Sequence, residues 1–125
     1  MNNIFFKSPE HQTRFIEAMQ AIGKLVNDGR FDPEYSAALY ILTSGLSMWE
    51  KTSGYVTRHG INFDTILEEV DFGGGHTRLV RLAGNLFNGN QHIDPLEFVH
   101  LDDGNFKVAI TAIKIRCKSL GGEEE

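Results

Sequence analysis

The sequence predicts an all-α fold: a compact single domain in which four longer helices and several short ones form a bundle. Three observations support this prediction. The chain has 125 residues, the usual size of one domain. It is 41% hydrophobic and contains nine Phe, three Tyr and one Trp, which is enough apolar surface for a core. In four stretches, apolar residues recur every three or four positions after a capping residue, as they do along one face of a helix.

The first helix is predicted to begin at Ser8, Pro9 and Glu10. Serine caps free backbone N–H groups, proline fits the first helical position, and an acid there favours the positive end of the helix dipole. The apolar face that follows consists of Phe15, Met19, Ile22 and Val26. Residues 27–29, with the sequence Asn-Asp-Gly, are the expected stop.

The second helix is predicted to begin in the same way, with Asp32 as cap and Pro33 in the first turn. One face carries Tyr35, Ala38, Leu39, Leu42 and Leu46. The other side carries Ala37, Tyr40 and Ile41 and is also apolar, so we expect this helix to be central and buried on most sides. Gly45 leaves two alternatives open: it ends the helix, or it permits close packing while the helix continues to Trp49.

The third helix is predicted over residues 77–88, with Thr77 as its cap. Its apolar face consists of Leu79, Leu82, Ala83 and Leu86. Asn88, Gly89 and Asn90 are typical of a left-handed exit from a helix.

The fourth helix is predicted over residues 105–120, with Gly121 after it. Its apolar stripe consists of Phe106, Ala109, Ile110, Ile113 and Cys117. Phe106, Val108, Ile110 and Ala112 also alternate as in a strand. The length of the segment and the preceding acids Asp102 and Asp103 favour the helix.

Weaker signals lie between these helices. Residues 64–70 are predicted to form a short helix capped by Asn62 or Asp64, and Asp94 with Pro95 begins a turn that carries Leu96, Phe98 and Val99. Residues 52–61 and 71–76 are expected to be loops, and a small β-hairpin through Val56 is left open. The domain is expected to span residues 1–120, followed by a disordered acidic tail at 121–125.

The charge of the chain disfavours direct nucleic-acid binding. The formal net charge is -5, but Glu123, Glu124 and Glu125 contribute three of the 17 acids, so the body carries 14 acids against 12 bases. A protein that binds by neutralising phosphates usually has a basic excess. The only basic cluster, Lys114, Arg116 and Lys118, is better explained as the end of a helix.

The sequence predicts a cytoplasmic protein. Cys117 is the only cysteine, which excludes an internal disulfide and fits a reducing compartment. The N-terminal residues lack the apolar segment of a signal peptide, and no apolar run is long enough to span a membrane.

No pattern of catalytic or metal-binding residues is recognisable, so we expect no catalytic residues, no metal and no cofactor. Five scattered histidines lack the spacing of metal ligands. Cys117 lies on the predicted apolar stripe and is expected to be buried and unreactive. The glycine run 73–75, followed by His76, is favoured as a flexible connector. The alternative is a phosphate or small-ligand site that uses this loop with Arg78 or Arg81.

Two groups of residues are candidates for binding a partner. Tyr55 and Arg58 lie in an expected loop, and such residues often anchor protein interfaces. The second group is acidic: Glu68, Glu69, Asp71, Asp102 and Asp103.

Four blocks of the sequence resemble a small bacterial protein family with no assigned function: FFKSPEHQTRF, DPEYSAALYILT, RLAGNLFNG and AIKIR. The resemblance implies an origin in phages or other mobile elements, and it carries no catalytic residue. Small acidic proteins of such elements often bind host proteins. The leading hypothesis is therefore a non-enzymatic inhibitor of a host defence nuclease, such as a CRISPR effector, that acts by steric or acidic-surface occlusion. The alternatives are a ligand-binding protein or enzyme and a nucleic-acid-binding regulator. The apolar second helix fits a monomer core or a homodimer seam.

Overall fold

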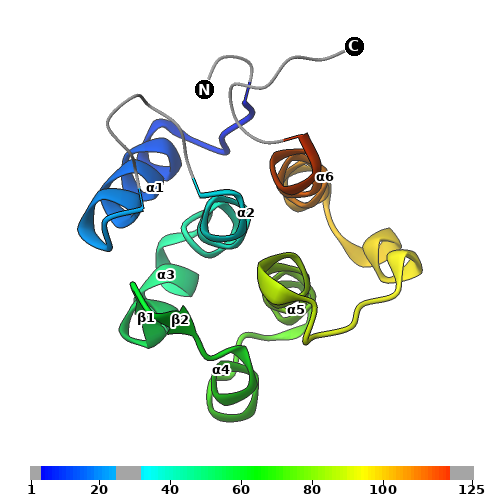
Figure 1. Cartoon of the computed structure of the whole chain (residues 1–125). Coiled ribbons are helices and arrows are strands. Elements are labelled where there is room, and N and C mark those ends of the chain that lie inside the picture. The colour runs from blue at the N-terminus through cyan, green and yellow to red at the C-terminus, as the bar shows by residue number, and fades with distance from the viewer. Residues whose placement is uncertain (1–3, 25–31, 119–125) are drawn as a thin grey trace.

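The computed structural model describes residues 4–24 and 32–118, and it confirms the mainly helical fold (Figure 1). In chain order its elements are α1 (Pro9–Ala21), α2 (Pro33–Leu42), α3 (Leu46–Thr52), the 3-10 helix η1 (Ser53–Tyr55), β1 (Val56–Thr57), β2 (Gly60–Ile61), α4 (Phe63–Glu69), α5 (Gly74–Asn88), the 3-10 helix η2 (Pro95–His100) and α6 (Asp103–Lys118). The hairpin through Val56 is present: β1 and β2 pair antiparallel, with Val56 opposite Ile61.

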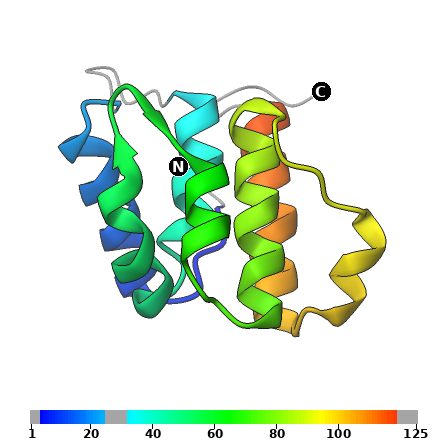
Figure 2. The same cartoon turned by 90° about the horizontal axis from the view of Figure 1, so that it is seen from below.

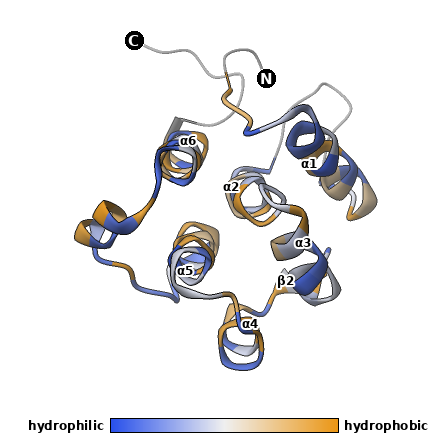
Figure 3. Ribbon diagram, turned by 180° about the vertical axis from the view of Figure 1, so that it is seen from behind, coloured by the Kyte–Doolittle hydropathy of each residue, from blue (hydrophilic) through white to orange (hydrophobic). Residues whose placement is uncertain are grey.

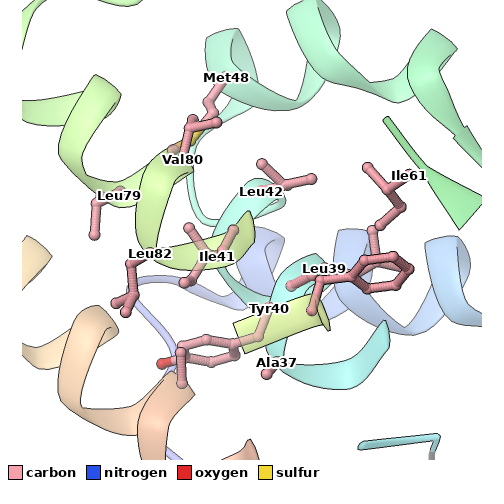
Figure 4. Packing of buried hydrophobic residues seen from close by; sticks show 14 of the residues in the cluster. Ala37, Leu39, Tyr40, Ile41, Leu42, Met48, Ile61, Leu79, Val80 and Leu82 are labelled. Carbon is pink, nitrogen blue, oxygen red and sulfur yellow. The ribbon is translucent and has the colours of Figure 1, made fainter. Parts of the chain in front are cut away.

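Helix α2 is the centre of the fold, as its apolar faces predict. Every residue from 35 to 44 is buried. The helix packs against α1, α3, α5 and α6, which surround it in Figure 1. Figure 4 shows its side chains interleaved with those of the neighbouring elements. The labelled core residues are Ala37, Leu39, Tyr40, Ile41, Leu42, Met48, Ile61, Leu79, Val80 and Leu82.

Helices α5 and α6 run in the same direction, whereas α2 and α4 run opposite to them (Figure 2). A parallel pair of helices needs a connection that returns along their length. Residues 89–102 make that connection and carry η2 on the outside of the bundle. Gly89, with a φ of 80°, ends α5 in the left-handed conformation that the sequence predicts. The N-termini of α5 and α6 consequently lie at the same end of the molecule.

Four predicted caps are confirmed: Ser8, Asp32, Asn62 and Asp94. Ser8 Oγ accepts a hydrogen bond from the backbone N–H of His11 at 3.0 Å. The Asp32 carboxylate accepts from the N–H groups of residues 34 and 35. Asn62 Oδ1, rather than Asp64, caps α4. The predicted turn after Asp94 is the 3-10 helix η2, which that carboxylate caps.

The ends of the first two helices differ from the prediction. α1 ends at Ala21, and Gly23 follows with a φ of 75°, so the helix stops before the expected signal at 27–29. Those residues and Val26 lie outside the described part of the chain. α2 ends at Leu42, before Gly45, and the hydroxyls of Thr43 and Ser44 bond to the backbone carbonyls of Leu39 and Ile41 at this end. Gly45 is the N-cap of α3, and Leu46 is 56% exposed rather than on the core face.

The beginning of α5 is also a correction. Residues 71–76 are not all loop, because the helix starts at Gly74 and Thr77 is inside it. The Thr77 hydroxyl donates to the backbone oxygen of Gly73 at 2.6 Å and therefore does not cap the N-terminus. Gly73 is the N-cap, with a φ of 78° that favours glycine.

The buried face of α6 is rotated from the predicted stripe. The buried residues are Asn105, Val108, Ala109, Ala112 and Ile115. Phe106 is 44% exposed, and Cys117 is exposed as well. Both large residues, Val108 and Ile115, and small ones, Ala109 and Ala112, are on this face, and α6 packs against α2. The strand alternative is wrong. Gly121 and the tail at 121–125 lie outside the described residues.

Candidate partner-binding surface

The acidic candidates lie at one end of the bundle. Glu68 and Glu69 are in the last turn of α4, Asp71 precedes α5, and Asp102 with Asp103 begins α6. These parts of α4, α5 and α6 all lie at the lower end of the molecule in Figure 2. Each of these acids is exposed. Side chains that the sequence separates by more than thirty residues therefore face solvent from the same end.

Tyr55 belongs with the acidic end. Its hydroxyl donates a hydrogen bond to Glu69 Oε1 at 3.0 Å, which ties η1 to the C-terminal turn of α4. Because this carboxylate stabilises the protonated phenol, the hydrogen bond raises the pKa of Tyr55. The structure thus joins one residue from each of the two predicted groups.

Asp71 has a local structural role in addition to its charge. Its Oδ1 accepts from the N–H of Gly73 at 3.2 Å, which orders the turn into α5. The ammonium group of Lys51 donates to the backbone oxygen of Asp71 at 2.8 Å and lies 5.9 Å from the centre of the Phe72 ring. This lysine adds one cation at the edge of the acidic surface.

Asp102 and Asp103 are partly explained by helix capping. Asp102 Oδ1 accepts from the N–H of Asn105 at 2.8 Å, and Asp103 is in the first turn. Both charges are favourable beside the positive end of the helix dipole. Lys7 lies nearby and donates to Asn105 Oδ1 at 3.0 Å. The exposed carboxylates nevertheless remain available to a partner, since one cap bond leaves most of their acceptor positions open.

Arg58 lies apart from the other candidates. It is between the two strands of the hairpin, which extends toward the upper end of the molecule in Figure 2. Tyr35, at the start of α2, donates to the backbone oxygen of Thr57 at 2.6 Å and fixes the hairpin there. The structure therefore separates Arg58 from the acidic end.

Both arginines beside the glycine run pair with an acid of η2. Arg81 donates two hydrogen bonds to the Glu97 carboxylate, at 3.1 and 2.9 Å. Arg78 Nε lies 3.6 Å from the same carboxylate. The hydrogen bond from Arg81 is the main cause that lowers the pKa of Glu97, and the charges of both arginines add to it. The arginines hold η2 against α5, and residues 74–76 are helical rather than a flexible connector.

Cys117 corrects another prediction. Its side chain is exposed, in a shallow hollow beside Arg116 and Gly89 rather than in the core. The Arg116 guanidinium donates to the backbone oxygen of Leu86 at 2.7 Å, which links α6 to the end of α5. Within residues 4–24 and 32–118, no group of three or more His, Cys, Asp or Glu side chains could hold a metal ion.

Sequence reasoning missed the role of His11, which is fully buried. The backbone N–H of Lys7 donates to its Nδ1 at 3.1 Å, so Nε2 carries the proton and donates to the backbone oxygen of Tyr40 at 2.8 Å. Burial is the main cause that lowers the pKa of His11 to about 4, and the charges of Arg14 and Lys7 add to it. One signal was present: His11 precedes Phe15 by one helical turn and thus shares its buried face.

The family model that matches residues 1–119 describes a family of unknown function, DUF6075. The chain belongs to this family. No curated protein and no solved structure matches it. None of the helices in the described residues is long and apolar enough to cross a membrane.

Proposed function

We propose that this protein is a non-enzymatic protein-binding module that docks its acidic end on a basic surface of a partner. The observation that carries the proposal is the meeting of acids from three separate segments at one end of the bundle (Figure 2). Glu68, Asp71 and Asp103 are exposed there. Clustered charge of one sign speeds encounter with a surface of opposite sign and disfavours partners of like sign.

The distribution of bases strengthens this proposal. No lysine or arginine occurs between Arg81 and Lys107, so the whole connection from α5 to α6 is without them. Of the cations near the acidic end, Lys7 is bonded to Asn105, Lys51 to a backbone oxygen, and Lys107 lies over the Phe5 ring. The carboxylates at this end therefore present their charge to solvent rather than to an internal lysine.

We propose further that the partner is a host defence nuclease. A host defence nuclease, such as a CRISPR effector, has a basic channel for nucleic acid, and an acidic end of this kind occludes it. Support comes from the charge complementarity and from the resemblance to proteins of phages and mobile elements. This proposal predicts that the purified protein inhibits cleavage by such an effector, and unchanged cleavage at saturating protein would contradict it.

The test of the general proposal is an affinity capture from host lysate with nuclease added, followed by kinetics with the purified partner. The variant Glu68→Gln/Asp103→Asn removes two charges from the acidic end without touching the Tyr55 bond or the Asp102 cap. We expect it to lower the association rate about tenfold at low salt, and less at high salt. Glu17→Gln/Glu34→Gln, on exposed acids elsewhere, is the matched control. Equal rates for the two variants would contradict the proposal.

A further inference from the structure

The 3-10 helix η2 carries two of the most exposed large hydrophobic side chains among the described residues. Leu96 and Val99 are each 72% exposed. Figure 3 shows hydrophobic residues on this peripheral coil, which lies outside the packed α-helices. Isolated exposed apolar residues are common on protein surfaces, but two that share one face need a physical account.

The geometry of a 3-10 helix places these two side chains in one row. With three residues per turn, side chains at positions i and i+3 lie directly above one another. Phe98 and Leu101 form a row that packs against the core. Glu97 belongs to a second row and faces the arginines of α5. Leu96 and Val99 form the third row, which faces solvent, and we call this pair the η2 ridge.

The η2 ridge is held in place before any partner arrives. The Asp94 carboxylate accepts from the N–H of Leu96 at 2.9 Å, and the N–H of Glu97 donates to the backbone oxygen of Asp94 at 2.8 Å. The Arg81 guanidinium donates two hydrogen bonds to the Glu97 carboxylate. A two-bond contact of this kind fixes orientation as well as position. A surface that is already ordered loses less conformational entropy on binding.

The charges around the η2 ridge indicate the chemistry of its partner. Asp94 precedes the ridge, Asp102 and Asp103 follow it, and all three are exposed. Phe106, 44% exposed, adds apolar surface one turn into α6. A second copy of this chain would bring the same acids face to face. The surface instead complements an apolar groove with lysines and arginines on its rim.

We propose that the η2 ridge is the apolar anchor of this protein, and that it inserts into an apolar groove with a basic rim on a partner protein. The proposal rests on the proposed protein-binding function and continues the acidic end along the chain, because Asp102 and Asp103 follow η2 directly. In this proposal the acids raise the association rate, and the ridge lowers the dissociation rate of the complex. Glu97 is a positioning residue, since it acts on the ridge through Arg78 and Arg81.

The experiment measures binding of the purified protein that the wild-type chain captures. Leu96→Ser/Val99→Ser removes the ridge from positions that are largely in solvent, and Leu46→Ser is the matched control on another exposed leucine. We expect the ridge variant to raise Kd at least about 30-fold, mainly through faster dissociation, and Leu46→Ser to leave it within about twofold. Glu97→Gln should give an intermediate rise in Kd. Thermal unfolding of each variant checks folding, and Leu96→Ala/Val99→Ala replaces the serine variant if that one unfolds.

The outcomes separate the two proposals. If the ridge variant binds like the wild type while Glu68→Gln/Asp103→Asn binds more slowly, the ridge is not the anchor and the acidic end still is a binding surface. If the wild-type chain captures no protein, or if no variant changes binding, the results contradict both the acidic binding surface and the ridge as its anchor. A photo-reactive leucine at position 99 adds an independent measurement. Crosslinks to apolar partner residues beside lysines or arginines support the inference, and crosslinks to an acidic partner surface overturn it.

Discussion

The helix α2 buries its apolar residues, whereas the connection 89–102 leaves several of its apolar residues exposed. Every residue from 35 to 44 is buried, and the hydroxyls of Thr43 and Ser44 find acceptors within the helix itself. No residue from 89 to 102 is fully buried, and its strongest fixed point is the ion pair of Glu97 with α5. The contrast indicates a division of roles. α2 is enclosed by the core, whereas the connection packs on it through Phe98 and Leu101 and presents Leu96 and Val99 to solvent.

The largest expected effect on the free energy of unfolding comes from making the same substitution in both regions. Leu39→Ala removes a side chain with no exposed surface and should lower the free energy of unfolding by about 2–5 kcal/mol, through lost burial and the cavity that remains. Leu96→Ala changes a side chain that is 72% exposed and should stay within about 0.5 kcal/mol. Urea unfolding of both variants measures the difference. Comparable losses would show that the connection contributes to stability as α2 does.

A second test concerns the point where the connection is anchored to α5. A Cβ atom on Gly84 would lie 2.6 Å from Cγ of Gln91 and 3.0 Å from Cγ of Phe63. Gly84→Ala should therefore displace the start of the connection and cost about 1–3 kcal/mol. Gly75→Ala, in the same helix with no atom within 4 Å, is the matched control and should be neutral or stabilising by up to about 1 kcal/mol. If both alanines stabilise the protein, the close approach at Gly84 is not a real constraint.

Local chemistry explains which parts of the fold could be predicted from the sequence. Ser8, Asp32 and Asn62 cap helices through bonds to N–H groups two or three residues away, so their neighbours alone identify them. The start of α5 and the buried face of α6 were not predicted. The turn before α5 is ordered by the Asp71 carboxylate and needs a positive φ at Gly73, and no residue type at 74–77 indicates that the helix begins there. The buried face of α6 depends on packing against other helices, where Ala109 and Ala112 are buried and Phe106 is 44% exposed.

The candidate surface also combines features that neighbouring residues determine with features that depend on the packing of distant segments. The exposed acids could be identified by residue type, but their meeting at one end depends on α5 and α6 running in parallel (Figure 2). His11 and Glu97 have partners 29 and 16 residues away, namely Tyr40 and Arg81. No local pattern predicts such pairs, because they form only when distant segments pack together.

The buried His11, which bonds to the backbone of α2, makes the free energy of unfolding sensitive to acid. In the folded protein, Nδ1 faces the backbone N–H of Lys7, so a proton on that nitrogen would replace a hydrogen bond with a clash of two donors. Burial of the imidazole is the main cause that lowers the pKa of His11 to about 4 in the folded state, against 6.5 for an exposed histidine. Below pH 6.5 the unfolded chain binds a proton that the folded chain does not. The free energy of unfolding must then fall as the pH falls from 6.5 toward 4.

A third prediction follows from this shift. Between pH 7 and pH 5 the wild-type protein should lose about 2 kcal/mol, because each pH unit in this window contributes up to about 1.4 kcal/mol. His11→Gln keeps an N–H donor for the Tyr40 oxygen but does not titrate, so its unfolding free energy should be lower yet nearly constant over the same window.

Glu97→Gln is the control for the connection. The pKa of Glu97 lies below its ordinary 4.5, so the ion pair is intact throughout this window and the control should retain the wild-type loss. Urea unfolding at both pH values measures all three proteins, and a pH-dependent loss that survives in His11→Gln would assign the acid sensitivity to another group.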